Sequence, residues 1–291
     1  MGKKKITAST LQDMKDRNEK ITMLTAYDYP TARLLDEAEI DCILVGDSLG
    51  NVILGYDNTL PVNMGEMLHH TRAVTRGVDH SLVIADMPFL AHKTGHGKAI
   101  RNAGRFIQEA EAEAVKVEGG SESLEPIEEI VDSGIPVMGH LGLTPQRILQ
   151  FGGYRIQGKT PEKAKKILED ALKLEEVGVF SVVLESIPQE LGKIITERLE
   201  IPTIGIGAGP HCDGQVLVLH DILGLSEISP KFVKEYEDLG SSLKEAAKSF
   251  QNEVKKSEFP TSKHSYNLEK GKLEKLKKFI EKTLKSDLLV L

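Results

Sequence analysis

The chain has 291 residues, of which 40% are hydrophobic and 28% charged, and its formal net charge is −7. These values are typical of a soluble globular protein and fit one large α/β domain. The negative charge and the absence of Trp argue against nucleic acid as a partner, and no apolar run is long enough to span a membrane.

The amino terminus, MGKKKITAST, is basic but is not followed by an apolar segment, so we expect no secretory signal. Cys42 and Cys212 lie far apart and belong to no CxxC motif. Reduced thiols and a cytoplasmic location are therefore expected.

Short apolar segments alternate with amphipathic segments along most of the chain. Eight segments have the composition of buried strands, at 20–26, 42–46, 81–85, 114–117, 135–138, 179–184, 202–206 and 215–219. The main helices are predicted at 10–16, 31–38, 64–76, 98–112, 124–131, 161–177 and 189–199. Ser9 or Thr10 is expected to cap the first helix, and Thr160 the helix that begins at Pro161.

Strands that alternate with helices pair in parallel and are buried on both faces. Eight such units between residues 20 and 219 predict a (β/α)8 TIM barrel with an extra N-terminal helix and C-terminal helices. A doubly wound open sheet is the alternative. We expect a single domain over 1–291, with about 268–291 as a C-terminal helical extension. Its helix 272–284 has an apolar face, which favours packing on the barrel or a neighbouring subunit over a membrane surface.

Acidic residues stand where four of the apolar strands end. They are Asp47, Asp86, Glu118 and Glu185. In both candidate folds the carboxyl ends of the strands carry the functional site. A carboxylate at the end of a buried strand is costly unless it is paired, and a metal ion is a common partner.

Asp47, Asp86 and Glu118 follow three consecutive strands. Neighbouring strands lie about 5 Å apart, so these carboxylates are expected to converge. Hard oxygen ligands favour Mg2+ over Zn2+. Alternatively, each acid caps the next helix or pairs with a nearby Lys, but three acids in register favour the metal site.

Other polar residues lie near the same strand ends. Lys116 is two residues before Glu118, so both point into the barrel, where Lys116 binds a substrate carboxylate or forms a buried salt bridge to Asp86. Glu185 has apolar neighbours and is a candidate general base, although it could instead cap the following helix. His140, after the fifth predicted strand, fits a structural or a catalytic role.

The segment GIGAG, at 205–209, follows the seventh strand. Late loops of barrels commonly bind phosphate or another anion, but a tight turn explains the glycines equally well. The segment lacks the context of a dinucleotide-binding fingerprint.

Seven motifs follow one another along the chain. They are MLTAYD (23–28), LVGDSLG (44–50), ADMPF (85–89), VKVEGG (115–120), PVMGHLGLTPQ (136–146), GGYRIQG (152–158) and IPTIGIGAGPHCDGQVLV (201–218). In this order they resemble the ketopantoate hydroxymethyltransferase family, and the resemblance covers residues 20 to about 265. It implies a (β/α)8 barrel that forms a homodecamer. The implied reaction transfers a hydroxymethyl group from 5,10-methylenetetrahydrofolate to 3-methyl-2-oxobutanoate, a step toward pantothenate.

The resemblance also implies roles for individual residues. Asp47 and Asp86 would bind Mg2+, with Glu118 as a third ligand through water. Substrate binding would involve Asp47, Ser48, Asp86, Lys116 and His140. Ser48 would hold the substrate carboxylate with Lys116 as its counter-charge, and His140 would lie near the transferred group. Glu185 would accept the C3 proton, giving an enolate that Mg2+ stabilises.

Two segments depart from the family pattern. Residues 92–98 (HKTGHGK) are longer and more basic than expected, and the tail beyond about residue 267 is an extension. Two other functions are alternatives. One is a metal-dependent phosphoenolpyruvate mutase or carbon–carbon lyase, but the lyases typically carry a loop Cys that neither Cys42 nor Cys212 supplies. The other is a non-catalytic assembly protein, against which the full set of acids argues.

Overall fold

The computed structural model describes residues 4–95, 97–226 and 230–287, with side chains as far as residue 284. The chain divides into two compact units, Met1–Glu237 and Asp238–Leu291. The larger unit holds every polar residue that the sequence singled out as a candidate for the site.

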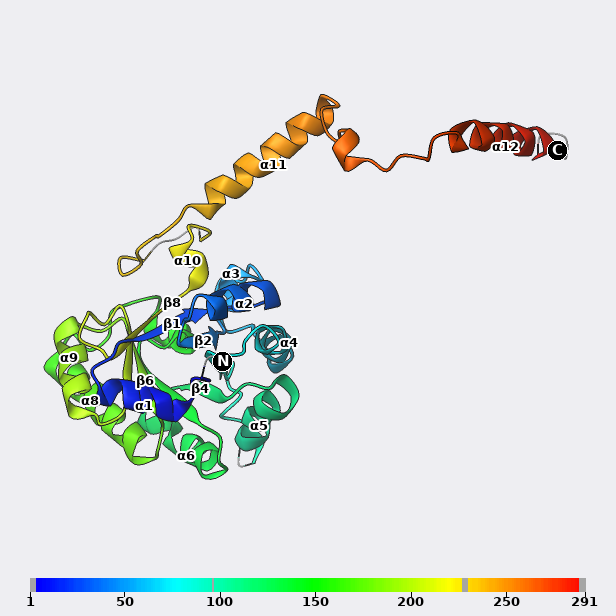
Figure 1. Ribbon diagram of the computed structural model, residues 1–291. Helices are drawn as coiled ribbons and strands as arrows, with labels where there is room; N and C mark the ends of the chain where they lie inside the picture. The colour runs from blue at the N-terminus through cyan, green and yellow to red at the C-terminus, as the bar shows by residue number, and fades with distance from the viewer. Residues whose placement is uncertain (1–3, 96, 227–229, 288–291) are drawn as a thin grey trace. The chain divides into compact units, whose positions relative to one another are not determined.

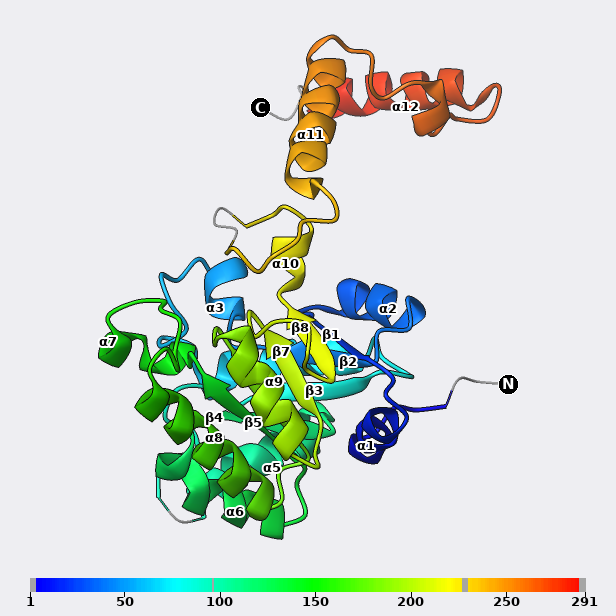
Figure 2. The same cartoon turned by 90° about the vertical axis from the view of Figure 1, so that its left-hand side faces the viewer.

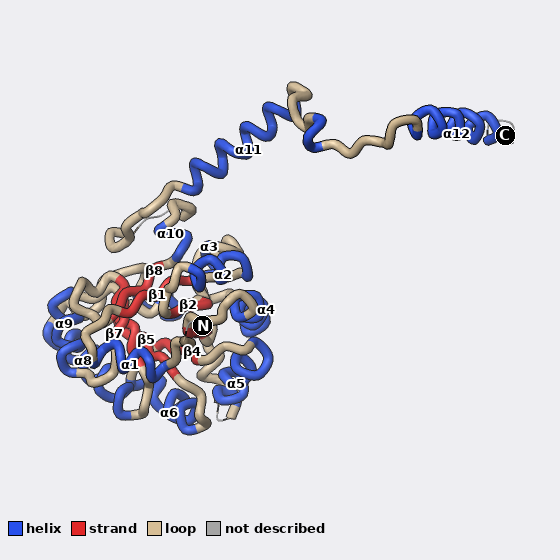
Figure 3. Tube along the Cα trace, viewed as in Figure 1, coloured by secondary structure: helices blue, strands red, loops and turns tan. Residues whose placement is uncertain are grey.

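The larger unit contains a closed barrel of eight parallel strands in sequence order (Figures 1 and 3). Each strand pairs with its neighbour in the chain, and β1 pairs with β8 to close the ring. The strands are β1 (Ile21–Thr25), β2 (Cys42–Val45), β3 (Leu82–Asp86), β4 (Ala114–Glu118), β5 (Val137–Gly142), β6 (Ser181–Glu185), β7 (Thr203–Ile206) and β8 (Gly214–Leu217). The predicted (β/α)8 barrel is confirmed, and the open sheet is not formed.

Helices surround the strands (Figure 2). The longer ones are α2 (Tyr29–Glu37), α4 (Met64–Thr75), α5 (Lys98–Ala110), α6 (Leu124–Asp132), α8 (Pro161–Glu176) and α9 (Gln189–Arg198). Shorter turns of helix are α3 (Leu49–Val52), η1 (Ser121–Ser123), η2 (Pro145–Arg147), α7 (Ile148–Phe151) and α10 (Leu219–Ile222). Between β7 and β8 the chain forms a loop without a helix.

Side chains along each strand alternate between the barrel interior and the surrounding helices. The interior is filled by apolar residues such as Met23, Leu44 and Ile84, and α1 (Ala8–Asp16) adds Leu11 and Met14 to the same cluster. Nearer the carboxyl ends of the strands, the alternate positions that face the interior are occupied by polar residues. The barrel therefore has an apolar interior and a buried polar layer at its carboxyl end.

Two details differ from the predictions. Thr7, and not Ser9 or Thr10, caps α1, because its side chain accepts a hydrogen bond from the Thr10 N–H and the Thr10 hydroxyl accepts one from the Thr7 N–H. The fifth strand continues beyond residue 138, so His140 lies within β5 and not after it. Pairing of β5 with both β4 and β6 extends the strand through Gly139, although Gly is a poor strand former. The predicted Thr160 cap of α8 is confirmed.

The second unit contains α11 (Leu239–Lys255), η3 (Ser262–His264) and α12 (Lys272–Asp287). Asp238 caps α11 by accepting a hydrogen bond from the Ser241 N–H. The predicted helix 272–284 falls within α12, and what its apolar face contacts stays a prediction. Among the helices of the described residues, none combines the length and apolar character of a membrane span.

Candidate active site

Five consecutive strands bring polar side chains to one buried layer at the carboxyl end of the barrel. Asp47 and Ser48 follow β2, and the other residues stand within the strands themselves: Asp86 in β3, Lys116 and Glu118 in β4, His140 in β5, and Glu185 in β6. The strand register places Asp86 beside Lys116 and Glu118 beside His140. The predicted residues are therefore neighbours in space.

Lys116 lies among the acids of this layer. Its Nζ is 2.6 Å from Oδ1 of Asp86, and both side chains are at most 5% exposed. The other oxygen of Asp86, Oδ2, accepts a hydrogen bond from the Asp47 N–H at 3.0 Å. The predicted buried salt bridge between Lys116 and Asp86 is thus present, and both residues point into the barrel.

His140 connects the acid of β4 with the acid of β6. Its Nδ1 lies 3.3 Å from Oε1 of Glu118, and its Nε2 lies 3.2 Å from Oε2 of Glu185. The Glu185 side chain is 15% exposed, whereas His140 is almost fully buried. Glu185 is therefore the acid of this layer that solvent and a substrate reach most easily.

Glu185 does not cap the helix after β6. The N-cap position of α9 is Pro188, and no side chain accepts a hydrogen bond there. The carboxylate instead lies beside His140, so the alternative that Glu185 caps the following helix is wrong.

The charges of the layer are strongly coupled. Burial, together with the negative charges of Asp86 and Glu118, raises the pKa of Asp47 well above its ordinary value. Burial also raises the pKa of Asp86, although the Lys116 ammonium opposes it. Burial alone would lower the pKa of Lys116, but the surrounding carboxylates raise it above its ordinary value. Lys116 is therefore a permanent cation among acids that repel one another.

The pKa of His140 depends on the same charges. Burial and the nearby Lys116 act to lower its pKa, but contacts with Glu118 and Glu185 outweigh them and raise the pKa to about 9. Burial acts to raise the pKa of Glu118, but the His140 contact outweighs it and leaves that pKa below its ordinary value. At neutral pH the two residues thus form an imidazolium–carboxylate pair.

Two further residues of the site were not singled out from the sequence. Gln146, in η2 after β5, donates from Nε2 to Oδ2 of Asp47 at 2.8 Å. The hydroxyl of Tyr27, after β1, lies 2.8 Å from Oγ of Ser48. Both fall inside the recognised motifs. Tyr27 follows the end of β1, which is a signal that could have found it, whereas Gln146 stands in a loop with no comparable local signal.

The donor set fits Mg2+. In the described part of the chain, no group of three or more His, Cys, Asp or Glu side chains is arranged to hold a metal ion. Mg2+, however, is commonly bound by one or two carboxylates with water and substrate oxygens. Asp47 and Asp86 supply two such carboxylates. Burial, with the charges of Asp86 and Glu118, raises the pKa of Asp47, and a bound cation would favour its charged form.

Glu118 is the third acid of this part of the layer. Its Oε2 accepts a hydrogen bond from the Gln146 N–H at 3.0 Å, and its Oε1 faces His140. Both oxygens of Asp86 also have partners, in Lys116 and the Asp47 N–H, so these contacts do not distinguish a direct ligand from one that acts through water.

The glycines of the GIGAG loop are explained by backbone geometry. Gly207 and Gly209 have φ of 64° and 83°, in the left-handed region that favours glycine. A Cβ at Gly209 would come within 2.3 Å of the Gln189 side chain. Tight turning and close packing therefore account for these residues without a bound anion.

Comparisons with known proteins agree with the motifs. The family model for ketopantoate hydroxymethyltransferase matches residues 5–262. Similar curated proteins named 3-methyl-2-oxobutanoate hydroxymethyltransferase include one from Clostridium botulinum, 55% identical over 93% of this chain and 98% of that protein. Another, from Syntrophomonas wolfei, is 52% identical over 94% of this chain and 99% of that protein.

Solved structures show the same fold at much lower identity. A 2,3-dimethylmalate lyase of the PEP mutase/isocitrate lyase superfamily is 13% identical, with a TM-score of 0.56, and the match covers 98% of each chain. A phosphoenolpyruvate phosphomutase from Streptomyces platensis subsp. rosaceus is 14% identical, with a TM-score of 0.59, over 98% of this chain and 100% of that one. At such identity the likeness concerns the fold alone.

Proposed function

The chain belongs to the ketopantoate hydroxymethyltransferase family, and from that premise we propose how its buried acids perform the family's reaction. The reaction transfers a hydroxymethyl group to 3-methyl-2-oxobutanoate and gives ketopantoate, in pantothenate biosynthesis. We propose 5,10-methylenetetrahydrofolate as the donor, Mg2+ as the metal, and the residues of β2 to β6 as the active site.

Asp47 and Asp86 would hold Mg2+, with Glu118 acting through water. When bound, Mg2+ supplies a Lewis acid that stabilises negative charge on the 2-oxo oxygen of the substrate. Ser48 would donate hydrogen bonds to the substrate carboxylate, and its hydroxyl is held in place by Tyr27. Lys116 supplies a fixed positive charge next to that carboxylate, because the surrounding acids keep it protonated.

Glu185 would act as the general base. It takes the proton from C3, and the electron pair of the C–H bond moves to form an enolate. The nucleophilic C3 then bonds to the methylene carbon of the donor as one of that carbon's two C–N bonds breaks and the freed nitrogen takes up a proton. The oxygen of a water molecule then replaces the second nitrogen on the methylene carbon, and that nitrogen takes a proton from the water, which gives ketopantoate and tetrahydrofolate. His140 orients the Glu185 carboxylate from 3.2 Å.

The observation that carries this proposal is the connection from Asp86 to Glu185. Lys116 pairs with Asp86, lies 3.3 Å from His140, and His140 contacts Glu185. Asp86, the proposed metal ligand, and Glu185, the proposed base, thus belong to one connected set of buried side chains. A 2-oxo acid bound at the metal would present C3 toward the base.

The direct test uses 3-methyl-2-oxobutanoate in deuterated water, with and without methylenetetrahydrofolate. We expect exchange of the C3 proton without the folate and ketopantoate formation only with it, both followed by NMR. Cleavage of the 2-oxo acid without folate would indicate a lyase. Neither exchange nor product would indicate a protein without this activity.

Two coarser properties complete the proposal. A homodecamer is proposed from the family, and light scattering of the purified chain would test it. A cytoplasmic location is proposed because Cys42 and Cys212 are buried, unbridged thiols, and fractionation of cells would test it.

A further inference from the structure

Gln146 makes an unusual set of contacts for a neutral side chain. It is 5% exposed. Its Nε2 donates to Oδ2 of Asp47 at 2.8 Å and to the main-chain carbonyl of Met87 at 2.9 Å, while its main-chain N–H donates to Oε2 of Glu118 at 3.0 Å. One residue of the loop after β5 is therefore bonded to groups at the carboxyl ends of β2, β3 and β4.

These contacts fix the orientation of the amide. Oδ2 of Asp47 and the carbonyl of Met87 are both acceptors, so the nitrogen and not the oxygen of the amide must face them. Both N–H groups of the amide are then used. Met87 directly follows Asp86, and its carbonyl anchors the amide to the backbone of β3.

The bonds also leave a free position on Asp47. In the described residues, Oδ2 accepts the amide N–H, and no hydrogen bond uses Oδ1. A Lys or Arg in the place of Gln146 would hold Asp47 as firmly but would neutralise it. The amide holds the carboxylate and leaves its charge available for a cation.

We propose that Gln146 is the positioning residue of the metal site, which holds Asp47 and Glu118 in the arrangement that binds a divalent cation. The inference rests on the proposed Mg2+ site. Gln146 acts through the carboxylates and touches neither the substrate nor the ion. Residues that orient metal ligands typically change metal affinity or activity by about 10- to 100-fold when replaced.

The test is Gln146→Met, which keeps the side-chain volume and the main-chain bond to Glu118 but removes both amide donors. Mn2+ binding, measured by electron paramagnetic resonance without substrate, is expected to weaken by about 10- to 100-fold. Saturating Mn2+ should then restore most of kcat. Gln150→Met is the matched control, because Gln150 lies in the same loop but is exposed, and its affinity should equal that of the parent.

Each result has a defined meaning. Affinity of Gln146→Met within twofold of the parent overturns the inference, even if the variant is less thermostable. Weak binding with kcat that saturating Mn2+ does not restore also overturns it, because Gln146 would then act on the reaction itself. If Gln146→Met does not fold, the shorter amide of Gln146→Asn, which cannot span both acceptors, must show the loss. If the parent chain binds no Mn2+, the proposed metal site is overturned together with the role of Gln146. If the parent binds Mn2+ and Asp86→Ala does not, the metal site is supported, and Gln146→Met then tests the role of Gln146 alone.

Discussion

The two ends of the barrel use carboxylates in opposite ways. At the amino end, an acid stands directly before a strand and accepts the N–H of the neighbouring strand. Asp41, Glu113 and Asp213 do so before β2, β4 and β8, and their donors are the N–H groups of Thr22, Val83 and Thr203. At the carboxyl end, Asp86 and Glu118 also accept main-chain hydrogen bonds. There, however, the acids share one buried layer, and the charges of Asp86 and Glu118 disfavour the charged form of Asp47.

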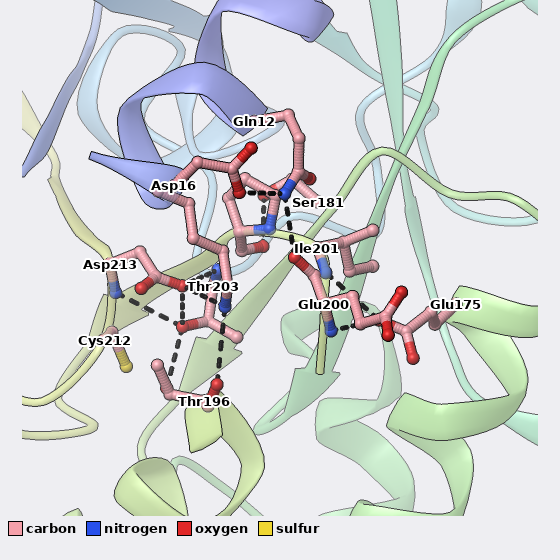
Figure 4. Close-up of polar contacts among 12 residues, drawn as sticks. Gln12, Asp16, Glu175, Ser181, Thr196, Glu200, Ile201, Thr203, Cys212 and Asp213 are labelled. Atoms are coloured by element: carbon pink, nitrogen blue, oxygen red, sulfur yellow. Dashed lines mark hydrogen bonds and ion pairs between the residues drawn. The ribbon is translucent and has the colours of Figure 1, made fainter. Parts of the chain in front are cut away.

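The amino-end network also fastens α1 to the barrel (Figure 4). Oδ2 of Asp213 accepts bonds from the N–H and the hydroxyl of Thr203, and Lys15 of α1 lies 2.9 Å from the same oxygen. Gln12 of α1 donates to the carbonyl of Glu200 before β7. These acids accept main-chain hydrogen bonds, and Asp213 also pairs with Lys15 of α1, so they contribute to stability.

The two ends differ in the effect of their acids on the stability of the fold. The acids at the amino end join neighbouring strands through main-chain hydrogen bonds, whereas burial and the charges of Asp86 and Glu118 raise the pKa of Asp47. A barrel concentrates function at the carboxyl end of its strands. Substitutions at the two ends are therefore expected to separate activity from stability.

Glu185→Gln gives the largest expected effect. The amide keeps the shape of the side chain but cannot accept the C3 proton, so exchange in deuterated water should fall by about 10²- to 10⁴-fold. Binding of 3-methyl-2-oxobutanoate with Mg2+, measured by calorimetry, should be retained. The exposed Glu190→Gln in α9 serves as the control and should exchange normally. Unchanged exchange in Glu185→Gln would remove this residue from the role of base.

Asp213→Ala addresses the amino end. It leaves the buried N–H of Thr203 without its acceptor and Lys15 without its partner, so the free energy of unfolding should fall by about 1–3 kcal/mol. Because Asp213 lies at the end of the barrel opposite the site, kcat should stay unchanged. Urea unfolding and a steady-state assay measure both quantities. The exposed Asp132→Ala in α6 should change stability by less than about 0.5 kcal/mol, and a similar loss in both variants would contradict the amino-end role.

Asp47→Asn should raise the free energy of unfolding, whereas Asp213→Ala should lower it. The amide removes a charge that burial, Asp86 and Glu118 disfavour, and it can still accept the Gln146 N–H. Without metal, the variant should be more stable by about 0.5–2 kcal/mol, as is common when a strained active site is relieved. Mn2+ binding should be lost at the same time. A variant less stable than the parent without metal would show that Asp47 is already compensated.

The carboxyl end was largely predictable from sequence, and the amino end was not. Asp86, Glu118 and Glu185 interrupt apolar runs, and period two correctly placed Lys116 and Glu118 on one face of β4. Asp213 stands just before a strand and resembles any polar residue of a loop. Its role depends on the lateral neighbour Thr203, which the register of the closed barrel determines and local sequence does not. The same holds for Gln146, because nothing in a loop reveals which strands lie beside it.

The smallest expected effect concerns Asp36 of α2. Its carboxylate accepts hydrogen bonds from the main-chain N–H groups of Asp79, His80 and Ser81, just before β3. Burial acts to raise its pKa, but these bonds and the Ser81 hydroxyl outweigh it and lower the pKa below its ordinary value. The charged form therefore stabilises the fold above the unfolded pKa of about 3.9, and this contribution is lost as the pH falls through the lower pKa of the folded state. Asp36→Asn cannot titrate, so its stability deficit relative to the parent should be largest above about pH 5 and should shrink toward pH 3. Urea unfolding of both chains across this range measures the deficit, and a constant difference would show that the amino-end acids do not owe their stabilising effect to charge.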